Sequence, residues 1–410
     1  MAPPTAPPPA LPSSPPASLP GFRTIDELPL ARQRVLIRVD FDVELDVSGN
    51  VAGDRKLQLA LPTIRKAIDE GARVVLATHL GGDKEQPRSL EPVAAKLAEL
   101  LRQEVFLPDE CVGDAARKVV SDLREGQVCL LENLRYAPEE AKNDEIFARK
   151  LAALCDVYVG EAFASTHLNA ASLVALPRSV KERGVGYRLR AELEALSPSG
   201  RVRERPCVGY LGGASLTSKL EVLELMLKRC DAVCVGGAIA NTLLAAKSLD
   251  LKASVFEREQ LALARGVLSR ARDHKQELIL PVDVLVGPNG DARESRAVSV
   301  GSIPDGMGAF DIGPRTLEAF TARLAGAKTA LVNGALGMLE NPTFADGTTG
   351  LLRALASAPT FGVVSGGSAA RAAYAAELVE GELGFISTGD VASLVLIEGK
   401  KLPGVEALRG

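Results

Sequence analysis

The chain has 410 residues, of which 46% are hydrophobic and 24% charged, and its formal net charge is −4. This length exceeds what one ordinary hydrophobic core supports, so we expect two domains in a soluble globular protein. The balance of charge excludes the broad basic surface that binds nucleic acid or an anionic membrane. Any anion site therefore has to be local.

Residues 1–20 are dominated by Pro, Ala and Ser, with no basic start and no continuous apolar stretch. They match neither a signal peptide nor a membrane span, so we expect a disordered tail over 1–21 and a cytoplasmic protein. No Cys-x-x-Cys pair occurs among the six cysteines, and the three histidines are widely dispersed. These patterns predict buried free thiols and no metal site built from protein ligands.

Short apolar runs alternate with amphipathic stretches along the first half of the chain. The apolar runs predict strands at 35–41, 74–79, 128–131 and 157–160. The amphipathic stretches predict helices at 59–70, 92–101, 114–123 and 144–154. Strands that alternate with helices indicate βαβ crossovers and a parallel sheet.

The second half repeats this plan, with predicted strands at 207–211, 232–235, 277–282, 329–332 and 361–364. Glycines follow four of these strands, at Gly212-Gly213, Gly236-Gly237, Gly334 and Gly366-Gly367. Glycine at a strand-to-helix turn lets backbone N–H groups approach a phosphate closely. Several such turns at one sheet edge indicate a nucleotide site, although a tight turn also needs glycine for its own geometry.

Between the halves, residues 187–196 combine strong helix formers with an apolar stripe, which predicts a rigid interdomain helix before a charged loop at 197–205. The chain is therefore expected to form two α/β lobes. A cleft between two domains is a favoured ligand site.

The first predicted strand carries the most informative residues of the chain. It delivers Arg38, Asp40 and Asp42 at its C-terminal end. Ligands of open α/β sheets bind beyond the carboxyl ends of the strands, so these charges are expected to be functional. An equally weighted alternative for Arg38 is that it only forms a structural ion pair.

From about residue 22 onward, the order and spacing of motifs resemble those of phosphoglycerate kinases. The matching stretches are Arg38-Val39-Asp40-Phe41, Ala60-Leu61-Pro62-Thr63-Ile64, His79-Leu80-Gly81, Leu131-Glu132-Asn133-Leu134-Arg135-Tyr136, Leu211-Gly212-Gly213-Ala214, Leu280-Pro281-Val282-Asp283-Val284, Asp311-Ile312-Gly313-Pro314, Asn333-Gly334, Gly366-Gly367, Ile386-Ser387-Thr388-Gly389 and Leu402-Pro403-Gly404-Val405. Each motif alone is weak, and together they cover nearly the whole chain.

The resemblance implies two Rossmann-like three-layer α/β/α lobes with parallel sheets, joined by an interdomain helix. An N-terminal lobe at 22–186 would bind 3-phosphoglycerate, and a C-terminal lobe at 201–390 would bind ATP or ADP with Mg2+. Residues 187–200 would form the interdomain helix and linker, and residues 391–410 would return to the N-terminal lobe. Hinge closure of a monomer would then allow phosphoryl transfer between the nucleotide and the acid, a step of glycolysis.

The resemblance also assigns site residues. Catalytic roles are implied for Lys56, Arg135 and Lys219. Contacts with the acid substrate are implied for Arg38, Asp40, Phe41, Asp42, Lys56, His79, Leu80, Gly81, Gly82 and Arg135. Contacts with the nucleotide are implied for Gly212, Gly213, Lys219, Gly237, Asn333, Glu340, Gly366, Gly367, Ser368 and Ala369. His79 has the alternative of a hydrogen-bonded cleft residue without a direct role.

Several positions depart from the family pattern. Lys56, Gly82, Leu168 and Ala170 stand where the family has basic residues, and Asp42 replaces an asparagine. Ser215 replaces a lysine, Ser368 replaces the aspartate tied to the metal, Ala335 replaces a proline, and Asp390 and Val391 replace glycines. Phosphoryl transfer depends on positioned charge, so these changes leave two alternatives to a working phosphoglycerate kinase. One is a catalytically impaired binding or regulatory protein, and the other is a kinase for a different carboxylic acid.

Overall fold

The computed structural model describes residues 19–81, 88–196 and 201–409. The chain divides into two compact units, Met1–Glu194 with Lys401–Gly410, and Ala195–Lys400. Most of the expected tail, residues 197–200 of the expected linker, and Gly82 lie outside the described residues. The C-terminal segment grouped with the first unit begins at Lys401, whereas sequence analysis placed the start of such a segment at 391.

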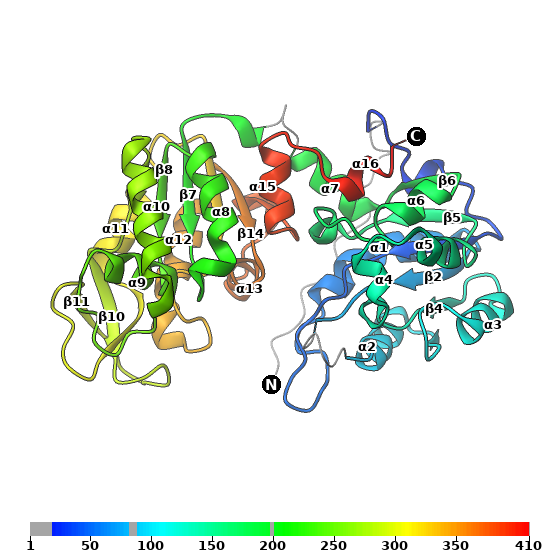
Figure 1. Ribbon diagram of the computed structural model, residues 1–410, viewed down its shortest axis with the longest axis horizontal. Coiled ribbons are helices and arrows are strands. Elements are labelled where there is room, and N and C mark those ends of the chain that lie inside the picture. The colour runs from blue at the N-terminus through cyan, green and yellow to red at the C-terminus, as the bar shows by residue number, and fades with distance from the viewer. Residues whose placement is uncertain (1–18, 82–87, 197–200, 410) are drawn as a thin grey trace. The chain divides into compact units, whose positions relative to one another are not determined.

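The first unit is built on a six-stranded parallel sheet with strand order β3-β4-β2-β1-β5-β6 (Figure 1). Its strands are β1 (Arg34–Arg38), β2 (Arg73–Ala77), β3 (Val105–Phe106), β4 (Val128–Leu130), β5 (Val157–Gly160) and β6 (Glu182–Val185). Its helices are α1 (Arg55–Asp69), α2 (Glu91–Leu101), α3 (Asp114–Asp122), α4 (Pro138–Ala141), α5 (Glu145–Ala152), α6 (Ala175–Ser179), α7 (Tyr187–Ala195) and α16 (Pro403–Glu406), with short 3-10 helices at Ile25–Glu27, Leu134–Tyr136 and Phe163–Ser165.

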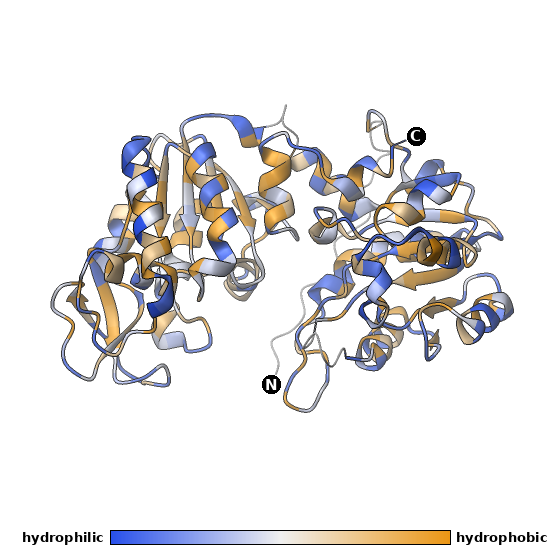
Figure 2. Ribbon diagram, viewed as in Figure 1, coloured by the Kyte–Doolittle hydropathy of each residue, from blue (hydrophilic) through white to orange (hydrophobic). Residues whose placement is uncertain are grey.

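The period of two along β1 sorts its side chains between the two faces of the sheet. Val35 and Ile37 lie in a fully buried cluster with Leu61 and Ile64 of α1 and Val93 of α2. The intervening residues of β1 face the other side. In Figure 2, β2 and β4 are hydrophobic apart from Arg73 at the start of β2, as expected for strands covered on both faces.

The second unit has its own six-stranded parallel sheet, with order β15-β14-β13-β7-β8-β9. Its strands are β7 (Cys207–Leu211), β8 (Ala232–Val235), β9 (Glu277–Ile279), β13 (Thr329–Asn333), β14 (Phe361–Ser365) and β15 (Gly384–Ile386). Its helices are α8 (Leu216–Arg229), α9 (Gly237–Ala246), α10 (Leu261–Asp273), α11 (Pro314–Ala322), α12 (Asp346–Ala356), α13 (Gly367–Ala375), α14 (Glu380–Leu383) and α15 (Val391–Ile397), with 3-10 helices at Arg201–Arg203, Arg258–Gln260 and Pro342–Phe344.

Helices cover both faces of this second sheet. Phe320 of α11 and Leu351 of α12 pack with Tyr210 and Val332 of the sheet in one buried cluster. On the opposite face of the sheet, a Cβ atom added to Gly209 would contact the side chains of Met226 in α8 and of Cys230, the residue that follows this helix. The predicted α/β architecture of two lobes with parallel sheets is confirmed.

A small antiparallel sheet in the second unit was not predicted. It consists of β10 (Asp283–Gly287), β11 (Arg296–Ser299) and β12 (Gly308–Ile312), in the order β11-β10-β12. The predicted strand 277–282 ends early, at Ile279, because Pro281 has no N–H to donate to a neighbouring strand. Within the described ranges, no helix combines the length and apolar character needed to cross a bilayer.

Candidate functional site

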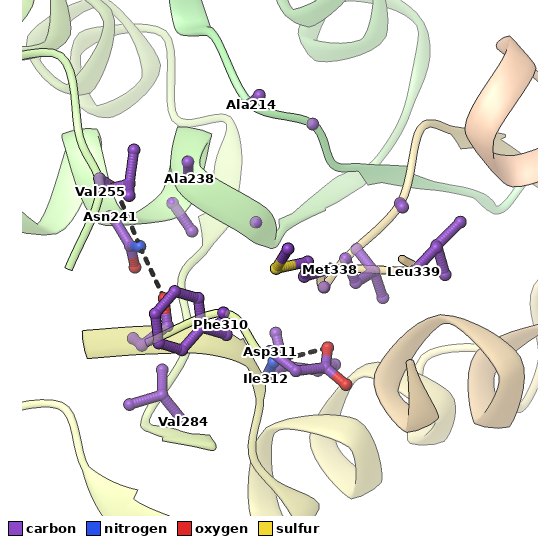
Figure 3. A pocket seen from close by; sticks show the side chains of 18 of the residues that line it. Ala214, Ala238, Asn241, Val255, Val284, Phe310, Asp311, Ile312, Met338 and Leu339 are labelled. Atoms are coloured by element: carbon purple, nitrogen blue, oxygen red, sulfur yellow. Dashed lines mark hydrogen bonds between the residues drawn. The ribbon is translucent and has the colours of Figure 1, made fainter. Parts of the chain in front are cut away.

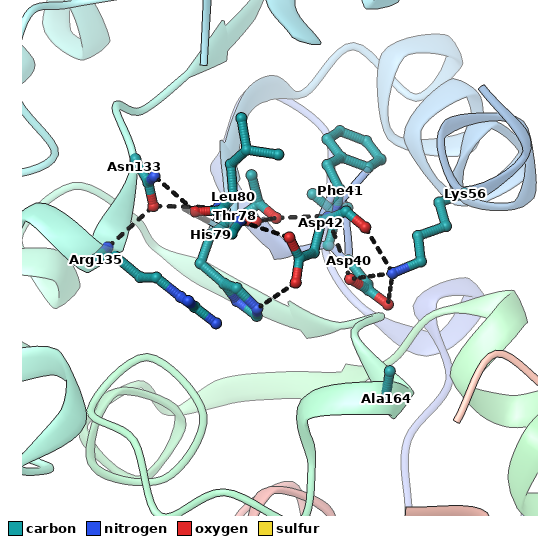
Figure 4. A network of polar contacts seen from close by, with 12 residues as sticks. Asp40, Phe41, Asp42, Lys56, Thr78, His79, Leu80, Asn133, Arg135 and Ala164 are labelled. Atoms are coloured by element: carbon teal, nitrogen blue, oxygen red, sulfur yellow. Dashed lines mark hydrogen bonds and ion pairs between the residues drawn. The ribbon is translucent and has the colours of Figure 1, made fainter. Parts of the chain in front are cut away.

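The polar cluster of the first unit lies where three neighbouring strands end. Asp40 and Asp42 follow β1, His79 follows β2, and Arg135 follows β4 (Figure 4). Because β4, β2 and β1 are adjacent and parallel, their carboxyl ends share one edge of the sheet. The structure therefore brings Asp40, Asp42, His79 and Arg135 of the sequence-predicted acid site together at the edge where α/β sheets bind ligands.

Lys56 is held in place by the two carboxylate residues. Its ammonium lies 3.3 Å from each carboxylate oxygen of Asp40. It also donates a hydrogen bond of 2.8 Å to the backbone carbonyl of Asp42. Lys56 projects from the first turn of α1, so this helix positions the cation at the sheet edge. Its charge is partly neutralised before any ligand binds.

Asp42 connects Lys56 with the loop after β2. Its Oδ1 accepts the backbone N–H of Gly81 at 2.5 Å, and its Oδ2 lies 3.5 Å from Nε2 of His79. Burial alone raises the pKa of Asp42, but the hydrogen bonds from His79 and Gly81 and the charge of Lys56 outweigh burial and lower the pKa to about 2. Asp42 is therefore ionised at neutral pH.

Arg38 is almost completely buried, with 1% of its surface exposed. Its guanidinium donates to Ser172 Oγ at 2.8 Å and to the Val39 carbonyl, and it contacts Nδ1 of His79 at 2.9 Å. Ser172 in turn donates to Glu140 at 2.6 Å. Arg38 and Glu140 are thus paired through a hydroxyl, and the position of Arg38 suits it to holding His79.

Arg135 is the exposed cation of this cluster. Asn133, which is fully buried, accepts the backbone N–H groups of Leu80 and Arg135 and so shapes both loops. No hydrogen bond or ion pair engages the Arg135 side chain among the described residues. The side chains of Phe41 and Leu80 lie in the hydrophobic core, so these two residues offer a ligand only their backbone.

In the second unit, glycine turns follow β7, β8, β13 and β14 at one sheet edge. A Cβ atom at Gly212 would lie 1.9 Å from the carbonyl oxygen of Ala335, so the approach of two loops requires glycine there. Gly366 has a φ of 80° and precedes α13, and a Cβ atom at Gly367 would meet nothing within 4 Å. The backbone N–H groups of these turns mostly donate to backbone carbonyls, as those of Gly212, Gly237 and Gly366 do. Those of Gly213 and Gly367 make no hydrogen bond among the described residues.

A pocket of about 600 Å³ lies beside these turns (Figure 3). Ala238 and Asn241 of α9, Phe310 of β12, and Met338 and Leu339 after β13 surround it. The pocket also includes predicted nucleotide-site residues, namely Gly213, Gly237, Glu340 and Ser368. Its largely apolar wall, with a few polar groups, is typical of a small-molecule site.

The remaining predicted nucleotide-site residues lie next to this pocket rather than in its lining. Lys219 donates to Oδ1 of Asn333 at 2.9 Å and pairs with Asp390 at 2.5 Å. Asn333 is fully buried at the end of β13. Ala369 is also fully buried, in the core beneath α13, so its side chain is not available to a ligand.

Sequence reasoning missed several groups at these two edges. Asp311 lines the pocket, and its carboxylate accepts the backbone N–H groups of Ile312 and Gly347. Burial raises its pKa to about 7, an effect that these two hydrogen bonds only partly offset. Asp311 belongs to the motif Asp311-Ile312-Gly313-Pro314, which could have indicated it as a site residue. No sequence motif indicated Glu140 or Glu257. Glu140 accepts a hydrogen bond from Ser172, and Glu257 accepts hydrogen bonds from residues 215–217, all of them distant in sequence.

Comparison with known proteins identifies the family. The family model described as phosphoglycerate kinase matches residues 25–400. The chain belongs to the phosphoglycerate kinase family. It is therefore a phosphotransferase, and the predicted glycolytic phosphoryl transfer between ATP or ADP and 3-phosphoglycerate or 1,3-bisphosphoglycerate is supported.

Individual relatives agree with the family model over nearly the full length. The phosphoglycerate kinase of Anaeromyxobacter dehalogenans (strain 2CP-C) is 46% identical over 391 residues, covering 94% of this chain and 98% of that protein. The enzyme of Desulforapulum autotrophicum is 41% identical, covering 94% and 100%. Among solved structures, the phosphoglycerate kinase of Pyrococcus horikoshii OT3 has a TM-score of 0.81 at 30% identity, covering 94% and 98%.

Proposed function

We propose that the polar cluster of the first unit binds 3-phosphoglycerate and that the pocket and glycine turns of the second unit bind ATP or ADP. The observation that carries the proposal is the pocket of about 600 Å³ beside Gly213, Gly237 and Ser368, next to the ammonium of Lys219. A nucleoside suits the apolar wall of this pocket. Its phosphates would then extend to the backbone N–H groups of Gly213 and Gly367 and to Lys219.

In the first unit, Arg135 is the proposed anchor for the acid's negative groups, since its guanidinium can bind a carboxylate or phosphate through two hydrogen bonds. Lys56 adds a second positive charge, which Asp40 already holds in place. Arg38 is proposed as a positioning residue, because its contacts are with Ser172, Val39 and His79. The acid would thus be held mainly by charge at the sheet edge.

The family uses ATP or ADP with Mg2+. In the described ranges, no group of three or more His, Cys, Asp or Glu residues is placed to hold a metal ion. The pocket does contain oxygen donors, in Asp291, Glu340 and Ser368, which are ligand types that Mg2+ accepts. We propose that Mg2+ arrives with the nucleotide, where it neutralises phosphate charge, and that Ser368 contributes at most a neutral oxygen.

For the reaction, a carboxylate oxygen of 3-phosphoglycerate attacks the γ-phosphorus of ATP and the bond from that phosphorus to the β-phosphate oxygen breaks. The products are 1,3-bisphosphoglycerate and ADP, and glycolysis runs the step in reverse. Hinge closure is the proposed means of bringing the two ligands together. Lys56, Arg135 and Lys219 are the residues proposed to stabilise the charge of the transferring group.

A coupled assay with ATP, Mg2+ and 3-phosphoglycerate tests this proposal. Turnover is expected, and Lys219→Ala is expected to lower kcat/KM about 100- to 1,000-fold, as the loss of one positioned charge does. Pure folded protein that does not exceed the Lys219→Ala variant would refute it. A panel of other carboxylic acids in the same assay distinguishes a kinase for a different acid from an impaired protein.

The two alternatives carry less support. An impaired binding protein and a kinase for another acid both rest on the substitutions noted above, and neither is favoured by 46% identity to a phosphoglycerate kinase over 94% of the chain. We further propose a monomer in the cytoplasm, which size-exclusion chromatography with light scattering and fractionation of the source cells can test.

A further inference from the structure

Lys219, the cation at the glycine turns, already holds an anion from its own chain. Its ammonium lies 2.5 Å from Oδ2 of Asp390, a residue 171 positions away in sequence. The side chain of Lys219 is 17% exposed and that of Asp390 is 44% exposed. The ion pair therefore sits at the accessible edge of the site rather than deep in the core.

Asn333 fixes the direction of this carboxylate. Its side-chain amide donates to Oδ1 of Asp390 at 2.6 Å and to Ser365 Oγ at 3.0 Å, while its carbonyl oxygen accepts from Lys219. Asp390 precedes α15, where an aspartate commonly caps the helix, yet it makes no capping hydrogen bond. Its carboxylate is turned away from its own helix and toward Lys219.

A second internal carboxylate occupies the start of α8. Glu257 accepts hydrogen bonds from the backbone N–H groups of Leu216 and Thr217 and from the hydroxyls of Ser215 and Thr217. These contacts bind Glu257 more extensively than Asp390 is bound, and they leave Lys219 untouched. Of the two carboxylates, Asp390 is therefore the one that an incoming phosphate can displace.

We propose that Asp390 is an internal competitor for the nucleotide phosphate at Lys219 and thereby sets the affinity for nucleotide. This inference rests on the proposed function, which assigns phosphate binding to Lys219. A phosphate reaching Lys219 has to break the Lys219–Asp390 pair. The displaced carboxylate then stays close to the phosphate and repels it.

Repulsion of this kind depends on the charge that the nucleotide brings. Mg2+ neutralises part of the phosphate charge, so Asp390 disfavours metal-free ADP more than Mg-ADP. Asp390 would thus bias the site toward the metal-loaded nucleotide without contacting the metal. Removing its charge should tighten binding of both forms, and that of metal-free ADP most.

The test compares ADP binding by calorimetry, with EDTA and with Mg2+, in the wild-type chain and in Asp390→Asn. This nearly isosteric change is expected to tighten metal-free ADP about tenfold, the size expected for removing one charge-assisted contact. Asp390→Glu, which keeps the charge, is expected to stay near the wild-type affinity. Asp250→Asn is the matched control, because Asp250 pairs with Lys252 at 2.8 Å and does not line the pocket.

The Lys219→Ala background decides whether the effect passes through Lys219. There, Asp390→Asn is expected to tighten ADP binding less than in the wild-type chain, because only the repulsion between carboxylate and phosphate is removed and no ion pair has to break. An equally large effect in both backgrounds would overturn the competition for Lys219. Unchanged or weaker ADP binding in folded Asp390→Asn, as judged by thermal unfolding, would overturn the inference. If neither the wild-type chain nor Asp390→Asn binds ADP, the inference is overturned as well.

Turnover is measured separately. Tighter binding without any kinase activity would support the role of Asp390 and refute the proposed function. Kinase activity without a change in ADP binding would support the proposed function and refute the role of Asp390.

Discussion

Arg38 and His79 are in direct contact, with Nη2 of the guanidinium 2.9 Å from Nδ1 of the imidazole. A guanidinium can only donate, so Nδ1 accepts and the proton of a neutral His79 lies on Nε2. Nε2 faces Asp42 at 3.5 Å. Arg38 thereby links the buried Ser172 and Glu140 to the polar cluster at the sheet edge.

Replacing Arg38 should cost stability because it leaves Glu140 buried without a compensating charge. We expect Arg38→Met to lower the free energy of unfolding by about 3 kcal/mol, as measured by urea denaturation. The double variant Arg38→Met/Glu140→Gln should recover part of this loss, because it removes both charges. Strictly additive losses in the double variant would show that the two charges are not coupled.

The lowered pKa of Asp42 predicts how stability depends on pH in acid. The carboxyl titrates at about 2 in the folded chain and near its ordinary value of 3.8 when unfolded. Its contribution is therefore complete above pH 4 and is lost as the pH falls toward 2. Asp42→Asn should be less stable at pH 7 by about 1 kcal/mol and should show a shallower loss between pH 4 and 2. Urea denaturation across this range measures both effects, and parallel curves would contradict the assignment.

The raised pKa of Asp311 predicts that folding stability changes with pH in the opposite direction. Burial raises its pKa from 3.8 to about 7, so the folded chain holds this proton more tightly than the unfolded chain. The contribution of Asp311 is complete below pH 4 and is lost as the pH rises through 7. Asp311→Asn should flatten this part of the stability profile between pH 4 and 7. An unchanged slope in the variant would place the titrating group elsewhere.

Cys129, Cys155 and Cys234 should be inert in the folded chain, whereas the hydrogen bond with Cys230 lowers the pKa of Cys207. All six are free and buried, and burial raises the pKa of Cys129, Cys155 and Cys234 to about 12. Thiolate is the reactive form, so these thiols should not react with Ellman's reagent at pH 8. Six equivalents should react after denaturation in guanidinium. Rapid reaction of Cys129, Cys155 or Cys234 in the native chain would contradict this prediction.

The sequence was most informative where local pattern and global fold agree. The strands 157–160, 207–211 and 232–235 have the predicted bounds, because each is a short apolar run between clear turns. The strand β3 has only two residues, too few for a periodic pattern. The antiparallel sheet of β10–β12 was missed because its strands are separated by long loops rich in Gly and Pro.

The candidate sites were likewise predictable from the sequence only in part. Sheet topology brings together residues such as Asp42 and His79 at one edge, and this followed from the positions of the strand ends. The pairing of Lys219 with Asp390 did not follow, although Asp390 was noted as a departure from the family pattern. Contacts between side chains so far apart in sequence depend on how the loops fold.

The division of the chain also bears on the order of folding during synthesis. The second unit is continuous in sequence, from 195 to 400, whereas the first unit is completed only by the last ten residues. Within these, the backbone N–H of Gly404 donates to Thr166 at 2.9 Å, and Leu408 packs against Gly160 at the end of β5. Residues 401–409 are translated after the whole of the second unit, so the first unit cannot complete its contacts before then, although most of it is translated first.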